Sequence, residues 1–195
     1  MEFAEARYPF DGPEWVFELK YDGYRVLGST GQEARLKTRR GAEATTWFPE
    51  VTESLKRLDD GFVIDGEMAV LDDLGRSNFE LLQDRARARR WRDGLPFVTY
   101  CVFDLLMHRG ADCRGWPLIE RKEALRELLA DQPDAILYVQ HVVGDGKWLF
   151  EHVLALELEG MIAKRLDSVY KSGERTREWL KIKRPGAVPA ERFRR

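Results

Sequence analysis

The sequence is poor in the residues that build metal sites and disulfide frameworks. Its two cysteines, Cys101 and Cys113, have neither a metal-ligand nor a redox spacing, and its three histidines form no His-x-x-x-His pair. A structural zinc site is therefore not expected. Two thiols also give no disulfide framework, which fits a reducing compartment.

Segments for export or membrane insertion are absent as well. The N-terminus carries Glu2 and Glu5 where a signal peptide has basic residues and an apolar core, and no apolar run approaches the ~18 residues of a membrane span. There is no internal repeat. We expect a cytoplasmic monomer without a membrane partner, and its 195 residues suffice for one large domain or two small ones.

Charge is distributed unevenly, although the formal net charge is only −2. From Lys164 to Arg195 there are eleven Lys and Arg against four Asp and Glu, and further arginines cluster between Arg85 and Arg92. A local positive excess favours a polyanionic partner such as a nucleic acid. A solvated basic face has the same composition, so charge alone does not decide.

One lysine stands out in the N-terminal part of the chain. Residues 15–19 form an apolar run typical of a buried strand, interrupted by Glu18, and Lys20 follows at the end of this run. A lysine at the mouth of a partly desolvated pocket loses its proton more easily, and the neutral amine is a nucleophile toward carbonyl or phosphoryl centres. Asp22, before a glycine, turns the chain and places a carboxylate beside the amine. Lys-x-Asp-Gly is also typical of an exposed β-turn, so both interpretations stay open on this motif.

Apolar alternation and helical spacing predict the remaining elements. Strands are expected at residues 14–20, 24–28, 34–38, 62–71, 96–106, 136–143, 158–165 and 179–183. Helices are expected at residues 46–58, 79–92, 118–129 and 148–158, and residues 1–12 are expected to form an irregular segment packed on the first strand. Because strands outnumber helices and most connections are hairpins, we expect an α+β fold of two packed antiparallel β-sheets flanked by helices.

Polar residues interrupt the buried strands at six places, each with the charge that a nucleoside triphosphate requires. These segments are Lys20-Tyr21-Asp22-Gly23-Tyr24-Arg25, Thr38-Arg39-Arg40-Gly41, Asp65-Gly66-Glu67, Tyr100-Cys101-Val102-Phe103-Asp104, Glu159-Gly160-Met161-Ile162-Ala163-Lys164 and Trp179-Leu180-Lys181-Ile182-Lys183. In this order they resemble the motifs of the covalent nucleotidyltransferases, the superfamily of ATP-dependent DNA ligases, RNA ligases and messenger-RNA capping enzymes. With Tyr170, Gly173 and Arg175 added, the sequence is most similar to the ligase domain of bacterial end-joining DNA ligases.

The resemblance implies an ATP-grasp-like nucleotidyltransferase (adenylation) fold over residues 1–184, with a nucleotide cleft between the sheets. Residues 185–195 are expected to be a basic linker or tail. Similar ligases continue into an OB-fold domain that orients pyrophosphate, but this chain stops 12 residues after Lys183. We therefore expect an excised domain or a minimal protein without the OB-fold domain, in which nick sealing is weak or depends on a separate partner.

The resemblance also implies a role for each matching residue. Lys20 would attack the α-phosphate of ATP and form lysyl-AMP. ATP would be bound by residues around this lysine, namely Glu18, Lys20, Arg25, Arg39, Glu67, Phe103, Lys181 and Lys183. Phe103 would stack on adenine and Glu18 would bind its amino edge, whereas Lys181 and Lys183 would neutralise the α-phosphate. Mg²⁺, or Mn²⁺, would be held by Asp22, Glu67 and Glu159. Taken singly, Phe103 also suits a plain core position, and Glu67 and Glu159 suit surface ion pairs.

The expected acceptor of AMP is nicked or broken duplex DNA in bacterial DNA repair, at the nucleoid. Its backbone would be contacted by Arg39, Arg40, Lys164 and Lys183. Arg40 departs from the asparagine that similar ligases often carry there. A separate OB-fold or end-binding protein is the expected partner.

Two alternatives remain at this stage. An RNA ligase or a capping-type guanylyltransferase would share the motifs, and the nucleotide transferred, ATP or GTP, separates them. A non-catalytic module that binds nucleotide or nicked DNA would retain the pocket without turnover, and a lysyl-AMP adduct would exclude it.

Overall fold

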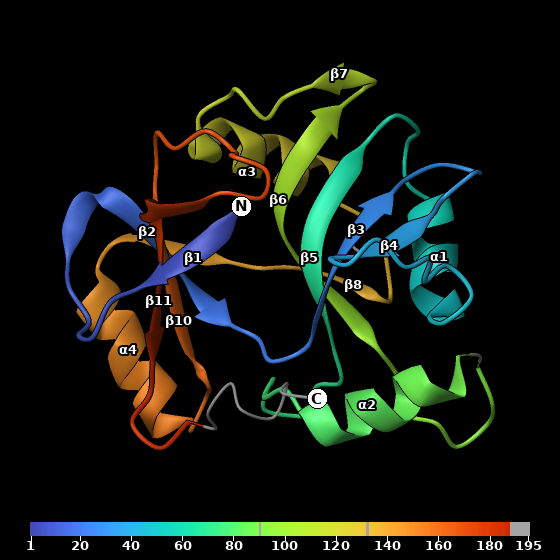
Figure 1. The fold of residues 1–195 in the computed structure, drawn as a ribbon, viewed down its shortest axis with the longest axis horizontal. Coiled ribbons are helices and arrows are strands. Elements are labelled where there is room, and N and C mark those ends of the chain that lie inside the picture. The colour runs from blue at the N-terminus through green and yellow to red at the C-terminus, as the bar shows by residue number, and fades with distance from the viewer. Residues whose placement is uncertain (90, 132, 188–195) are drawn as a thin grey trace.

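The computed structural model describes residues 1–89, 91–131 and 133–187, which form two β-sheets and four helices (Figure 1). Most strand neighbours are antiparallel. The expected α+β architecture of two antiparallel sheets with flanking helices is therefore confirmed. No helix in these ranges is long and apolar enough to cross a membrane.

The first sheet carries the lysine singled out above. Its five strands lie in the order β1 (Glu2–Glu5), β11 (Arg175–Lys183), β10 (Gly160–Arg165), β2 (Gly12–Lys20) and β9 (His141–Gly144). All neighbours are antiparallel except β1 and β11. Helix α4 (Gly146–Ala155) covers one face, where its apolar side chains pack on Phe17, Met161 and Ile182. The opposite face of this sheet packs against the second sheet.

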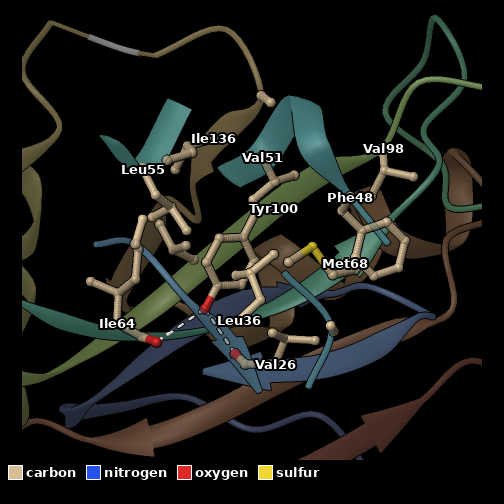
Figure 2. Packing of buried hydrophobic residues seen from close by; sticks show 14 of the residues in the cluster. Val26, Leu36, Phe48, Val51, Leu55, Ile64, Met68, Val98, Tyr100 and Ile136 are labelled. Carbon is tan, nitrogen blue, oxygen red and sulfur yellow. Dashed lines mark hydrogen bonds between the residues drawn. The ribbon is translucent and has the colours of Figure 1, made fainter. Parts of the chain in front are cut away.

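The second sheet contains most of the remaining strands. They are β4 (Leu36–Thr38), β3 (Tyr24–Ser29), β5 (Val63–Ala69), β6 (Thr99–His108) and β7 (Ala111–Asp112), with β8 (Ile136–Tyr138) parallel to β6. Its outer face packs against α1 (Pro49–Lys56), α2 (Phe79–Ala88) and α3 (Leu118–Leu128). Tyr100 lies in this core among Phe48, Val51 and Leu55, and its hydroxyl donates to the carbonyl oxygens of Val26 and Ile64 (Figure 2).

A second apolar layer joins the inner faces of the two sheets. It contains Val16 and Trp179 from the first sheet, and Ala69, Cys101 and Phe103 from the second. Because side chains alternate along a strand, residues two positions from these also face the space between the sheets. This alternation places the polar residues of the motifs in that space.

Several segments differ from the expectation, and β7 was not predicted at all. Residues 1–12 are not wholly irregular, because β1 pairs in parallel with β11, which itself begins earlier than expected, at Arg175. Residues 136–143 form two strands, β8 and β9, that pair with different sheets, so the chain crosses between the sheets there. Helix α2 ends at Ala88, before Arg89 in a left-handed conformation with φ 50°. Arg90 and the basic tail at 191–195 lie outside the described residues.

A buried ion pair ties α3 to both sheets. Nε and Nη2 of Arg121 donate to the two carboxylate oxygens of Asp104 over 2.7 and 2.9 Å, and both side chains are fully buried. Nη1 of Arg121 donates to the carbonyl oxygen of Ser168 over 2.9 Å. The Ser168 hydroxyl accepts from the indole of Trp179, so the network runs from β6 through α3 to β11.

Breaking this pair is expected to destabilise the fold strongly. Arg121→Met would leave the Asp104 carboxylate buried without its cation, at a cost of about 3–5 kcal/mol in the free energy of unfolding. Arg126→Met on the same helix removes an exposed ion pair with Glu123 and is expected to cost about 0.5 kcal/mol or less. Urea-induced unfolding of the two variants measures their free energies of unfolding. Equal losses of stability in the two variants would contradict the prediction.

Candidate active site

Lys20 is the last residue of β2, where three strands of the first sheet meet. Antiparallel pairing places Gly160 of β10 opposite Lys20, and Gly160 also pairs with Lys183 of β11 on its other side. A Cβ at position 160 would lie 2.3 Å from the carbonyl oxygen of Ile182, so only glycine allows this approach. The two lysines therefore flank a glycine on the inner face of the sheet.

Glu159 joins these two lysines. Its Oε2 lies 2.5 Å from Nζ of Lys20, and its Oε1 lies 3.8 Å from Nζ of Lys183. Burial raises the pKa of Glu159, opposed by the charge of Lys20, and the negative charge of Asp22 raises it further. Asp22 is fixed through its backbone N–H, which donates to the hydroxyl of Ser77 over 2.9 Å. The predicted nucleophile thus lies between carboxylates and a second ammonium.

The predicted metal ligands are only partly brought together. Within the described ranges, no group of three or more His, Cys, Asp and Glu side chains is placed to hold a metal ion. Asp22 and Glu159 do line one cavity with Lys20. Mg²⁺ commonly uses one or two protein carboxylates and completes its shell with water and substrate phosphates, so this pair fits a metal that arrives with a nucleotide.

Arg25 is held in one orientation on the facing sheet. Its Nε and Nη2 donate to the two oxygens of buried Asp65 over 3.1 and 2.6 Å. The hydroxyl of Tyr170 donates to the same carboxylate over 2.8 Å. The guanidinium lies 5.3 Å from the centre of the Phe103 ring. Arg25 and Phe103, predicted on different strands, are thus neighbours, and Asp65 and Tyr170 fix the arginine.

Glu67 pairs with Arg25 across β5 and β3 but forms no hydrogen bond or ion pair through its carboxyl with the residues that the structure describes. Burial raises the pKa of Glu67 to about 8, and the charges of Lys20 and Arg25 offset this only in part. Gly23 is packed so closely against β5 that a Cβ would lie 1.9 Å from the carbonyl oxygen of Met68. The lysine loop and the Glu67 strand are therefore in direct contact.

Glu18, two residues before Lys20 on β2, lies in a buried cluster with two lysines. Its Oε1 is 2.5 Å from Nζ of Lys122, and its Oε2 is 2.6 Å from Nζ of Lys164. Burial opposes the charged form, but the two ammonium groups outweigh it and lower the pKa of Glu18. Nζ of Lys164 also lies 4.4 Å from the centre of the Phe103 ring. Lys164, predicted to contact DNA, is 1 % exposed and does not present its charge to solvent.

Lys122 is a site residue that sequence reasoning missed. It lies on α3 in the buried stripe that includes Leu118, Leu125 and Leu129. A lysine at such an apolar position is the one signal that the sequence offers, since burying an ammonium requires a charged partner. The structure supplies Glu18 as that partner.

The other predicted cations lie near the edge of the site. Arg39 is exposed and pairs with Glu2, and Lys181 lies 2.8 Å from a carboxylate oxygen of Glu5. Arg40 is exposed. Both carboxylates belong to β1, a strand that was not expected, so β1 provides partners for Arg39 and Lys181 at this edge.

Two cavities open beside these groups. One of about 290 Å³ has Lys20, Asp22 and Glu159 on its wall. Another, of about 310 Å³, is lined by Arg25, Arg39, Asp65 and Tyr170 among others. The residues predicted for catalysis thus line two separate cavities, with Lys20, Asp22 and Glu159 on one and Arg25 and Arg39 on the other.

Comparison with known proteins identifies the family. The model of the family described as "ATP dependent DNA ligase domain" matches residues 2–183. The chain belongs to this family of ATP-dependent DNA ligase domains. The resemblance inferred from the motifs, including that to end-joining ligases, is confirmed.

Similarity to individual relatives supports the same family assignment. This ligase domain is 32% identical over 183 residues to the SPbeta prophage-derived DNA ligase-like protein LigB of Bacillus subtilis, covering 93% of the chain and 66% of that protein. It is 36% identical over 173 residues to the multifunctional non-homologous end joining protein LigD of Pseudomonas aeruginosa, covering 87% of the chain and 20% of that protein. The solved structure of mycobacterial DNA ligase D complexed with ATP and MES has a TM-score of 0.77 at 32% identity, with 93% of this chain and 58% of that chain covered. The chain thus spans less than two thirds of each.

The raised pKa of Glu67 predicts a specific pH dependence of stability. The folded state favours the protonated carboxyl, so the contribution of Glu67 to stability is full below its ordinary value of 4.5 and is lost as the pH approaches about 8. Relative to Glu67→Gln, the wild type should lose stability between pH 5 and pH 8. Urea unfolding at several pH values measures this, with exposed Glu53→Gln as the control. If the difference in the free energy of unfolding between the wild type and Glu67→Gln does not change with pH, the raised pKa of Glu67 is contradicted.

Proposed function

We propose that this ligase domain catalyses adenylylation of Lys20 by ATP and passes AMP to the 5′-phosphate of nicked or broken DNA. The observation that carries the proposal is the position of Lys20 between Glu159, Gly160 and Lys183, with Glu67 of the second sheet within range of its charge. The structure of a mycobacterial DNA ligase D with ATP, similar over 93% of the chain, supports ATP as the donor.

In the first step, the amine of Lys20 attacks the α-phosphorus. A nitrogen–phosphorus bond forms, the bond to the bridging oxygen breaks, and pyrophosphate leaves while the amine gives up its proton. Glu159 orients the amine before attack, and Lys183 lies on the far side of Gly160, where its charge stabilises the α-phosphate oxygens. Lys181, next along the same face of β11, adds a second ammonium.

Mg²⁺, when bound, would neutralise phosphate charge, and Asp22 and Glu159 would hold it. Glu67 has a free carboxyl beside Lys20, which suits a ribose hydroxyl or a metal-bound water. Phe103 would stack on the adenine. Glu18 would bind the adenine amino group through lone pairs that its two lysines leave free, since each carboxylate oxygen accepts more than one hydrogen bond.

The DNA acceptor would bind across the exposed cations. Arg39 and Arg40 are accessible, whereas Lys164 would serve the base pocket beneath Phe103 instead of the DNA backbone. A separate OB-fold or end-binding protein would complete the clamp on DNA, and such a substrate would place the protein at the bacterial nucleoid. The LigD relative is named for non-homologous end joining, which supports broken ends as the lesion.

The covalent step is tested by intact-protein mass spectrometry with ATP and Mg²⁺. The wild type is expected to gain one AMP that added pyrophosphate removes, and Lys20→Ala is expected to gain none, because the proposed attacking amine is removed. Lys56→Ala, a surface lysine on α1, serves as the control. An adduct with GTP in place of ATP would favour a guanylyltransferase, and no adduct at all would favour a binding module.

The DNA assignment predicts distinct salt dependences. Arg39→Gln should lower the slope of log affinity for nicked DNA against log salt by about 0.9, because one phosphate contact is lost. Lys164→Met should leave the slope unchanged, since its ammonium is buried against Glu18. Fluorescence anisotropy at several salt concentrations measures both. A lower slope in Lys164→Met would instead indicate that Lys164 contacts the DNA backbone.

A further inference from the structure

Arg184 is a rigid cation beside the nucleophile that no motif accounts for. It directly follows Lys183, and its backbone N–H donates to the carbonyl oxygen of Glu159 over 3.0 Å. Its guanidinium donates to three further carbonyl oxygens, those of Leu158, Pro185 and Glu157, over 2.9, 3.3 and 3.4 Å. Among the described residues, no carboxylate lies within ion-pair distance of this guanidinium. Its position is therefore fixed while its charge stays uncompensated.

Arg76 lines the same cavity, and hydrogen bonds to Asp72 hold it in place as well. Asp72 accepts hydrogen bonds from the backbone N–H groups of Leu74 and Arg76 and, over 2.7 Å, from Nε of Arg76. This arrangement orders the hairpin and leaves the terminal nitrogens of Arg76 as donors. The next residue, Ser77, accepts from the backbone of Asp22, so the hairpin is joined to the lysine loop.

Both arginines line the 290 Å³ cavity that has Lys20 on its wall. We propose that this cavity binds the β- and γ-phosphates of ATP, and then the pyrophosphate product, through Arg184 and Arg76. The inference rests on the proposed adenylylation of Lys20 and adds the site of its leaving group. An in-line displacement sends pyrophosphate away from the attacking amine, so its binding site must adjoin Lys20 and yet extend beyond it.

The charges on the cavity suit a magnesium-bound polyphosphate. Four carboxylates share the lining with the three cations, namely Asp22, Glu80, Glu157 and Glu159. Asp22 and Glu159 are the pair assigned to Mg²⁺, whose charge would offset theirs. Glu80 and Glu157 are exposed, so water screens their repulsion. A planar guanidinium presents paired donors to phosphate oxygens, which makes two ordered arginines a selective phosphate site.

The reverse reaction tests the site directly. Purified lysyl-AMP protein is mixed with Mg²⁺ and increasing pyrophosphate, and the loss of the adduct is followed by mass spectrometry. Arg184→Ala and Arg76→Ala are each expected to raise the half-saturating pyrophosphate concentration by about ten- to a hundredfold, since a charge-assisted phosphate contact is lost. Arg184→Lys keeps the charge but not the paired donors of the guanidinium, so its half-saturating concentration should lie between those of the wild type and Arg184→Ala. Exposed Arg57→Ala, outside the cavity and paired with Asp134, should change it less than about twofold.

Two further measurements separate the possible outcomes. Calorimetric titration of the protein without AMP with magnesium pyrophosphate tests binding even if no adduct forms, so failure of adenylylation is distinguished from failure of this site. Transfer of AMP from the preformed adduct to nicked DNA tests whether the phosphates belong to DNA. Pyrophosphate affinity unchanged in Arg184→Ala and Arg76→Ala would overturn the proposal. A loss of AMP transfer to nicked DNA as large as the loss of pyrophosphate affinity would also overturn it, because the phosphates bound by the two arginines would then be those of DNA.

Discussion

The antiparallel pairing of β10 with both β2 and β11 is the constraint on which the site depends. It brings together Lys20, Glu159 and Lys183, which lie far apart in the chain, and Gly160 at the centre is the residue that lets the strands approach. The ion pair with Glu159 then holds the Lys20 side chain in place without any ligand. A side chain at position 160 would separate the strands and with them the two ammonium groups of Lys20 and Lys183, which we propose to act on the same phosphate.

Buried charge gives this sheet its fixed relation to the rest of the molecule. Glu18, Lys122 and Lys164 are almost wholly inaccessible, and each has a partner of opposite charge. Such clusters gain little net stability, because desolvation opposes attraction, but a half-formed cluster is costly. Helix α3 is therefore restricted to the one position in which Lys122 reaches Glu18 and Arg121 reaches Asp104. Phe103, beside Lys164, is placed by the same restriction.

Much of this site follows from strand periodicity. Val16, Glu18 and Lys20 alternate on β2, as Trp179, Lys181 and Lys183 do on β11, so the sequence shows that they share a face. The edge strand β1 has weak periodicity and forms only because β11 offers free backbone groups beside it. The division of residues 136–143 is set by which sheet each half meets. Lys122 and Tyr170 reach their partners across more than 100 residues, and no local pattern reports such contacts. The metal site stays a prediction: Asp22 and Glu159 line one cavity, and among the described residues no group of three carboxylates that includes Glu67 is formed.

The pairing of charges in the cleft also explains why nucleotide and metal would act together. Lys20, Arg25 and Arg39 each have a carboxylate partner in the described structure, so a triphosphate must compete with Glu159, Asp65 or Glu2 for them. A divalent cation held by Glu159 and Asp22 would reduce that competition, because Glu159 would then no longer neutralise Lys20. Arg25 differs, since Asp65 is buried and also bound by Tyr170, so this arginine keeps its partner and offers only its remaining donors. In the described structure the guanidinium of Arg184 is bound by carbonyl oxygens alone, so a polyphosphate bound there would not have to displace a carboxylate.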